Sequence, residues 1–490
     1  MKNKTKVEIK KDKLPYQDSF EFYKKYTENG ELPSMLMESR SKHLAYGKQS
    51  IVIPNPAIIV TGKNEYFKLE AMTETGEAII DCFSKSDFPF VNDLKINSHT
   101  IEGHVKKADI KNLDEMARLK SPNTSHVIRT ILNKFDVNDE HAGLSGAFAY
   151  DFARQFYEIG NRFKNHEGND FHLFMGSTIA YFDDIKEQAQ LKRFFFKGKN
   201  DGLEEKISNK VFVPQPFKTY EDMSIDELFN KIVNAKEEVQ NGRFMQVVLS
   251  RTQGMSLQKP PIDSYNGLRE IKAPYSLYIC FGNEEYAYAA SPEILQKSED
   301  GSLHVRPIAG TIVRTGNSLK DFKEMLFLQT DPKERKEHTI LVDLGRNEMY
   351  KTCVYNTVTE KDLYVMEDNG HLTHLVSGIN GKLKPDIDSL HAFQVIHPAG
   401  TVTGGPKHEA MKYIEQNENS RRGYYAGGVG NFNHIGGCNI GLFIRGAYVN
   451  DGMSYIRSGM GIVFDSDPAK EVEEHLQKIA NASNALKVQK

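Results

Sequence analysis

Short apolar runs separated by turn-forming residues fill the first part of the chain, and this pattern restricts it to a strand-rich fold. Between about residues 34 and 196, segments such as SIVIPNPAIIV and GAFAYDF are interrupted by Gly, Pro, Asn and Asp, a spacing typical of β-strands and their turns. A few helical stretches lie between these runs. We therefore expect an α+β fold.

The composition of the 490-residue chain is that of an ordinary globular protein, 39% hydrophobic and 26% charged. No apolar run approaches the roughly 18 residues that a membrane helix needs. With 63 basic against 66 acidic side chains, there is no positive field to hold a polyanion. We therefore expect neither a membrane nor a nucleic acid as a partner.

The amino terminus and the cysteines bear on the cellular compartment. The lysine-rich start lacks the apolar segment of a secretion signal, which favours a cytoplasmic location. The four cysteines are scattered without a CxxC pair, which argues against a disulfide framework and against a zinc site.

Residues 196–224 mix charges, glycine and two prolines between more apolar regions, a composition typical of a linker or crossover. We place a division near Val213, which gives an amino-terminal region of residues 1–213 and a catalytic region of residues 214–490. A helix is expected to begin after the cap residue Ser224.

Glu337 lies on a helix with a well-marked start, because Asp331 caps it, Pro332 occupies its first position and Glu334 completes a capping box. It shares a helix face with three apolar residues, Ile340, Leu341 and Leu344. This is the core-facing side. A carboxylate there needs a cation or hydrogen-bond donors.

A second capped helix begins at Asp467 and Pro468 and carries Glu471 and Glu474, three residues apart on one face. Its buried stripe is predicted to consist of Val472, Leu476 and Ile479. A solvated surface would explain the two acids equally well. Mg²⁺ takes one or two protein carboxylates and completes its shell with water and an anionic substrate. We interpret these two acids and Glu337 as a magnesium site.

Three further polar residues are candidates for catalysis. Gln246 lies on the apolar strand FMQVVLSR and is either a core amide or an active-site hydrogen bonder. Glu293 follows an extended entry into a turn, where partial burial would raise the pKa of its carboxyl and suit it to proton donation. His374 begins a short alternating run and is either structural or a general acid or base.

Glycine is concentrated near the carboxyl end, where 14 of the 37 glycines lie between Gly400 and Gly461. Tight turns explain many of them, and a loop around a small anion would explain the others. The same region contains Tyr425, Arg445 and Gly459. An arginine fork with backbone N–H groups is suited to binding a carboxylate.

Ten motifs follow one another in the order of a known family. They are QVVLSR, SPE, PIAGT, DPKERKEH, LVDLGRN, HLVSGINGKL, GTVTGGPK, RRGYYAGGVG, IRSGMGIV and DSDPAKEVEEH. With them the chain resembles the chorismate-utilising enzymes, and within that family the large subunits of anthranilate synthases. The resemblance implies two facing, largely antiparallel β-sheets, with helices packed outside and the site between the sheets.

The resemblance also implies roles for individual residues. Glu337 and Glu474 resemble the family's Mg²⁺ ligands, with Glu471 assisting. Glu293 would protonate the departing C4 hydroxyl, and His374 matches the histidine associated with loss of pyruvate. The positions that resemble chorismate-binding residues are Gly310, Thr311, Thr401, Tyr425, Arg445, Gly459, Met460 (usually alanine in the family) and Gly461.

Two positions bear on the nucleophile. Water-using members of the family carry a lysine where this chain has Gln246, and the common aminodeoxychorismate synthases carry a lysine where it has Ala309. The resemblance therefore implies the Mg²⁺-dependent conversion of chorismate and ammonia to anthranilate and pyruvate, a step of tryptophan biosynthesis. Glutamine-dependent activity would need a separate glutamine amidotransferase subunit.

Half of the family's tryptophan-binding site is recognisable in the sequence. Glu38 and Ser39 match its LLES element, whereas its NPSPYMF element is replaced by IKAPYSLYI, which contains Pro274, Tyr275 and Ser276. We take these five residues as candidate tryptophan-binding positions. The altered element does not predict feedback inhibition.

Three alternatives remain open. A 2-amino-2-deoxyisochorismate synthase would share Gln246, Ala309 and the three glutamates but release its product without losing pyruvate. An aminodeoxychorismate synthase is a second alternative. A non-catalytic, tryptophan-binding regulatory subunit is the third, and it would not need the magnesium glutamates that this chain retains.

Overall fold

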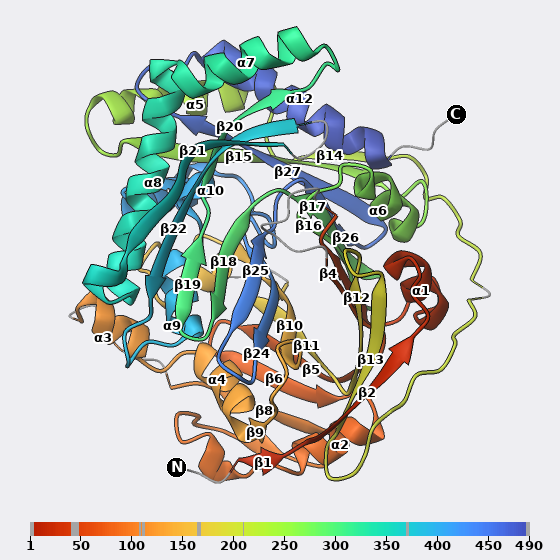
Figure 1. The fold of residues 1–490 in the computed structure, drawn as a ribbon. Helices are drawn as coiled ribbons and strands as arrows, with labels where there is room; N and C mark the ends of the chain where they lie inside the picture. The colour runs from red at the N-terminus through yellow and green to blue at the C-terminus, as the bar shows by residue number, and fades with distance from the viewer. Residues whose placement is uncertain are drawn as a thin grey trace.

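The computed structural model describes residues 4–40, 49–106, 109, 113–163, 168–208, 210–368 and 372–486. Within these residues, two large β-sheets form the body of the protein, and helices cover its outside (Figure 1). Strand pairing in both sheets is antiparallel. The predicted α+β fold of two facing, largely antiparallel sheets is confirmed.

The first sheet has 13 strands in the described part of the chain. In spatial order they are β20 (Ile308–Val313), β22 (Leu372–Lys382), β19 (Ser302–Val305), β18 (Ile294–Glu299), β25 (Cys438–Leu442), β24 (Gly428–Asn433), β10 (Gly143–Phe148), β11 (Phe171–Gly176), β5 (Pro56–Lys63), β6 (Tyr66–Ala71), β8 (Thr100–His104) and β7 (Lys95–Ile96), and β21 (Thr359–Asp368) pairs with β22.

The second sheet has 12 strands in the same described residues. In spatial order they are β14 (Thr219–Glu221), β15 (Gln246–Ser256), β27 (Met453–Ile462), β26 (Gly446–Asn450), β17 (Glu285–Ser291), β16 (Tyr275–Gly282), β3 (Ser34–Glu38), β4 (Gln49–Ile53), β12 (Thr178–Asp183), β13 (Gln188–Phe195) and β2 (Glu8–Leu14), and β23 (Gly404–Gly405) pairs with β15. A separate parallel pair joins β1 (Thr5–Lys6) to β9 (Phe135–Asp136).

Twelve α-helices of the described residues connect these strands. They are α1 (Ser19–Tyr26), α2 (Glu74–Ile80), α3 (Glu115–Lys120), α4 (Ser125–Lys134), α5 (Ile225–Gln240), α6 (Pro261–Arg269), α7 (Ser318–Thr330), α8 (Pro332–Thr352), α9 (Ser389–Ile396), α10 (Gly400–Thr403), α11 (Lys407–Asn417) and α12 (Pro468–Leu486). Among them, none is both long and apolar enough to cross a membrane.

The second sheet is buried on both faces, which explains the nearly continuous apolar sequence of its central strand β16. Leu277 and Ile279 enter the large core that also contains residues of the first sheet. Tyr278 and Cys280, which alternate with them, enter a second core beneath α1 and α6, as the two-residue period of a strand requires.

Both sheets take strands from either side of Val213, because the chain repeatedly crosses between them. The predicted division falls in the segment between β13 and β14, whose described residues form no helix or strand. Each crossing leaves residues at the junction of the two sheets. Two of these crossings carry the candidate site.

Candidate active site

Glu293 lies where the chain passes from β17 of the second sheet to β18 of the first. Its side chain is buried, and its Oε1 accepts a hydrogen bond of 2.8 Å from the Thr401 hydroxyl. Burial raises the pKa of the Glu293 carboxyl to about 8, although the Thr401 hydrogen bond and the Arg445 charge act in the opposite direction. The carboxyl is therefore mostly protonated at neutral pH.

Arg445 lies at a second crossing, between β25 of the first sheet and β26 of the second. The two crossings run side by side, because the Leu442 amide donates to the Glu293 carbonyl at 3.0 Å and the Ala290 amide donates to the Arg445 carbonyl at 3.2 Å. Burial lowers the pKa of the Arg445 guanidinium to about 10, which leaves it charged at neutral pH. The charged Arg445 side chain can therefore attract an anion that binds in this part of the protein.

His374 lies on β22, next to β20 at the end of the first sheet, and is close enough for the charge of Arg445 to act on it. Its buried imidazole is hydrogen bonded to the backbone of Gly310. Burial, aided by the Arg445 charge, lowers the pKa of His374 to about 3, so the ring is neutral near pH 7. It can accept or donate a hydrogen bond at a reacting centre without carrying charge.

Gly310 interrupts the pairing of β20 with β22, where the register shifts between Ala309 and Thr311. Its φ of +72° favours glycine. A Cβ at this position would lie 2.5 Å from Leu328 Cδ1 and 3.1 Å from Glu334 Oε2. The last turn of α7 and the first turn of α8 therefore pack directly against the bulge that carries Gly310 and Thr311.

Two glycines of β27 make room for polar side chains. A Cβ at Gly461 would lie 2.9 Å from Gln246 Nε2, and a Cβ at Gly459 would lie 2.6 Å from the Tyr425 hydroxyl. Gln246 is buried, and its Oε1 has no hydrogen-bond partner within the described residues. Met460, by contrast, lies in the hydrophobic core, as expected for the residue between them on a strand.

A cavity of about 550 Å³ adjoins Tyr425. Arginine side chains on its wall are held by buried carboxylates. Glu418 accepts from Arg422 Nη2 at 2.6 Å and from Arg457 Nη2 at 2.7 Å. This pairing fixes the segment that precedes Tyr425.

The three predicted magnesium ligands lie on α8 and α12. Glu337 and Glu471 are partly buried, whereas Glu474 is exposed and pairs with Lys478 at 2.7 Å. Lys478 also donates to the Gly459 carbonyl at 3.3 Å, so this face of α12 contacts β27. The described residues contain no group of three or more His, Cys, Asp and Glu side chains arranged to hold a metal ion.

The prediction of the buried face of α12 was wrong at one residue. Leu476, predicted to be in the buried stripe of α12, is 42% exposed, and His475 is fully buried beside Val472 and Ile479. The structure also places Glu334, which the sequence indicated only as a capping residue, beside the bulge at Gly310. Its signal was available, because it lies three residues before Glu337 on the same helix face.

The five candidate tryptophan-binding residues lie together at the end of β3 and the start of β16, where Glu38 pairs with Ser276. The Glu38 carboxylate is buried and accepts hydrogen bonds from Ser19, Tyr265 and Arg269. The hydroxyls of Ser39 and Ser276 are buried without a hydrogen-bond partner in the described chain.

Comparison with known proteins agrees with this geometry. The family described as chorismate binding enzyme matches residues 88–484, a range that contains the whole cluster around Glu293. The chain belongs to this family. Among members of known name, anthranilate synthase component 1 of Vibrio parahaemolyticus is 30% identical over 510 residues, covering 98% of this chain and 93% of that protein.

Solved structures of similar proteins share the fold of this chorismate binding enzyme. Anthranilate synthase component I from Streptococcus pneumoniae has a TM-score of 0.66 and 22% identity, covering 90% of this chain and 92% of that one. The menaquinone-specific isochorismate synthase from Escherichia coli has a TM-score of 0.68 and 15% identity, covering 99% and 95%. Proteins with different names therefore have the same architecture, and the reaction has to be argued from the site.

Proposed function

We propose that this chain is component 1, the large subunit, of an anthranilate synthase, which converts chorismate and ammonia to anthranilate and pyruvate with the help of Mg²⁺. The observation that carries the proposal is the Glu293 carboxyl, buried beside Thr401 and Arg445 and protonated near neutral pH. The name of the relative from Vibrio parahaemolyticus supports it.

Glu293 supplies the proton that the reaction needs. When ammonia attacks C2 of chorismate, the C4 hydroxyl leaves, and a neutral carboxylic acid can protonate the departing oxygen. A carboxyl with its ordinary pKa near 4.3 would be ionised at pH 7 and unable to donate. Burial therefore prepares Glu293 for this role.

The absence of an amine from two positions supports ammonia as the nucleophile. Gln246 ends in an amide, which cannot take a proton from water as a lysine base can, and Ala309 offers no amine for a covalent intermediate. The Gln246 side chain faces Gly461, and its Oε1 has no hydrogen-bond partner among the described residues. That acceptor suits a hydrogen bond from incoming ammonia.

The proposed contacts of the substrate carboxylates are Arg445, Tyr425, Thr311 and the backbone from Gly459 to Gly461. Arg445 is partly buried and its guanidinium is charged at neutral pH, so an anion bound beside it is attracted strongly. His374, neutral at this pH, is the group that we propose assists the elimination of pyruvate from the aminated intermediate.

Glu337, Glu474 and Glu471 would hold the Mg²⁺. Carboxylate oxygens are the ligands that this hard ion prefers, and two from the protein are sufficient when the substrate contributes others. The bound ion would neutralise the ring carboxylate of chorismate. Mg²⁺-dependent thermal stabilisation should weaken in Glu337→Gln and Glu474→Gln, whereas the neighbouring Glu473→Gln should keep it.

The reaction itself tests the proposal. Purified protein with chorismate, ammonium and Mg²⁺ should form anthranilate, detected by its fluorescence, and an equal amount of pyruvate, detected with lactate dehydrogenase. No product should form without ammonium. Absence of anthranilate under these conditions would rule the proposal out. An aminated product without pyruvate would identify one of the two aminodeoxy synthases instead, and the position of the amine, at C2 or at C4, would distinguish them.

A further inference from the structure

Helix α7 carries large apolar residues on the side that faces away from the protein. On its inner side Asp321 and Leu328 are buried. On the outer side, four apolar residues are exposed, by 66%, 61%, 49% and 57% of their surface. These residues, which we call the α7 stripe, are Leu319, Phe322, Leu326 and Phe327.

The α7 stripe has the organisation of an interaction surface. Leu319, Phe322 and Leu326 follow each other at intervals of three and four residues, so they line one face of the helix. The exposed residues Lys320 and Glu324 flank them and provide a polar rim. Contiguous apolar surface of this kind on a soluble protein marks a binding site, because water contact with it is unfavourable.

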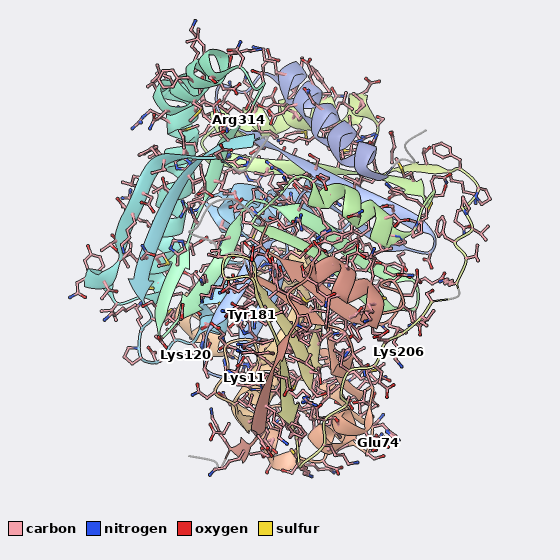
Figure 2. All side chains as sticks on the ribbon, turned by 45° about the vertical axis from the view of Figure 1, so that its right-hand side comes forward. Lys11, Glu74, Lys120, Tyr181, Lys206 and Arg314 are labelled. Carbon is pink, nitrogen blue, oxygen red and sulfur yellow. The ribbon has the colours of Figure 1, made fainter. Side chains whose placement is uncertain are left out.

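Helix α7 is held firmly against the protein by its other side. Asp321 accepts a hydrogen bond of 2.8 Å from the Thr315 amide and lies 3.7 Å from Arg314. Arg314, labelled near the top of the molecule in Figure 2, also pairs with Asp368 on β21. The helix therefore presents the α7 stripe from a fixed position, at the end of the molecule where α5 and α12 also lie (Figure 1).

The inner side of the same helix contacts the candidate active site. Leu328 packs against Gly310 on β20, beside Glu334 of α8. An α-helix with its side chains is about 10 Å thick. A protein bound to the α7 stripe would therefore stand about one helix thickness from the bulge that carries Gly310 and Thr311.

We propose that the α7 stripe is the docking surface for the glutamine amidotransferase component that supplies ammonia. This inference rests on the proposed function, because that reaction consumes ammonia. In water at neutral pH, ammonia is almost entirely protonated and cannot attack chorismate. A donor that docks next to the site can pass on the neutral molecule before it is protonated, and the relatives named component 1 imply a second component.

The test compares two nitrogen sources in the same variants. Phe322→Ser and Leu326→Gln, singly and together, remove apolar side chains that are 61% and 49% exposed. Ile185→Ser is the matched control, because Ile185 is 53% exposed in the turn between β12 and β13. The partner is the anthranilate synthase component 2 of the organism that makes this chain, and its affinity is measured by calorimetry.

With ammonium as nitrogen source, all variants should match the wild type. With glutamine and component 2, the double variant should lose about tenfold or more in affinity and in rate at limiting component 2, as expected when two central apolar contacts are lost. Ile185→Ser should lose neither. A double variant that still binds component 2 like the wild type would overturn the docking proposal.

Two other results would also overturn it. An equal loss with ammonium would mean that the outer side of α7 serves the active site itself. Dissociation of a wild-type homodimer by the variants, seen by analytical ultracentrifugation, would mean that a second copy covers the α7 stripe. Failure of the proposed function has a different signature, namely a wild-type chain that binds component 2 yet forms no anthranilate from ammonium.

Discussion

The Thr401 hydroxyl donates a hydrogen bond of 2.8 Å to Oε1 of Glu293, a carboxyl buried where the chain passes from one sheet to the other. Burial raises the pKa of Glu293, and the Thr401 hydrogen bond lowers it, with a net value of about 8. Thr401 therefore limits how far the pKa rises. Two predictions depend on this pair.

Replacement of Glu293 should remove the proton donor and leave the fold intact. Glu293→Gln keeps the shape and the hydrogen bonding of the side chain, so we expect a loss of about 10²–10⁴-fold in kcat with ammonium, the usual contribution of a general acid. Glu285→Gln is the matched control, since Glu285 is also a carboxyl with a raised pKa but is bonded to Tyr448 at 2.8 Å. Equal losses in both variants would contradict the assignment.

The pH dependence should follow the protonation of Glu293. In the proposed reaction the acid form of Glu293 is the donor, so activity should be present below the pKa of about 8 and fall as the pH rises through it. Thr401→Val removes a hydrogen bond that lowers this pKa, so the upper limb of the pH profile of kcat should move to higher pH. Thr401→Ser should leave it in place. If the upper limb of the pH profile moved to lower pH in Thr401→Val, Glu293 would not be the proton donor.

Gly461 should act through Gln246. A Cβ at Gly461 would approach Gln246 Nε2 to 2.9 Å, with no other contact closer than 4.0 Å. Gly461→Ala should therefore displace the amide and lower kcat/KM with ammonium by about tenfold, and the same change in a Gln246→Ala background should add little, because neighbouring substitutions are not additive. Independent, additive losses would show that the added methyl group does not act through Gln246.

Local sequence signals predicted the helix starts correctly, because capping depends on neighbouring residues. The Ser224 hydroxyl accepts from the Glu227 amide at 3.1 Å, and Asp331 accepts from the Glu334 amide at 3.1 Å. The helical periodicity gave a wrong prediction for α12, because it placed Leu476 in the buried stripe. The buried position is taken by His475, whose polarity gives no indication of burial.

Local sequence patterns could not show that the residues of the candidate site lie together in space. Glu293 and Arg445 meet because two crossings between the sheets run side by side, a relationship set by strand order over the whole chain. Nothing adjacent to either residue specifies its partner. The collinear motifs identified these positions through a resemblance, whereas burial, pKa and distance come from the fold.

Glu418 should stabilise the fold and should do so in a pH-dependent way. Burial alone would raise the pKa of Glu418, but the charges of Arg422 and Arg457 lower it overall. A carboxyl with a lowered pKa contributes stability above its unfolded pKa, near 4.3, and loses it as the pH falls. Glu418→Gln should therefore reduce the free energy of unfolding at pH 7 by about 3–5 kcal/mol.

Urea denaturation at pH 7 and at lower pH measures this effect. The difference between wild type and Glu418→Gln should shrink as the pH falls below the unfolded pKa, because protonation removes the charge that the substitution removes. Glu409→Gln is the control, since Glu409 pairs with Lys412 at the surface, an interaction worth about 0–1 kcal/mol. A difference that stays constant with pH would exclude an ionic role for Glu418.

Tryptophan should not inhibit this enzyme, because the carboxylate predicted to bind it is already saturated. Glu38 accepts from Ser19 at 2.7 Å, from Tyr265 at 2.6 Å and twice from Arg269, at 2.8 and 2.9 Å. A carboxylate has about four acceptor sites, so the ammonium group of tryptophan would have to displace a buried donor. We expect an unchanged rate of anthranilate formation from ammonium at saturating tryptophan, and no thermal shift. Inhibition that is relieved in Ser39→Ala would show instead that the site rearranges to admit the ligand.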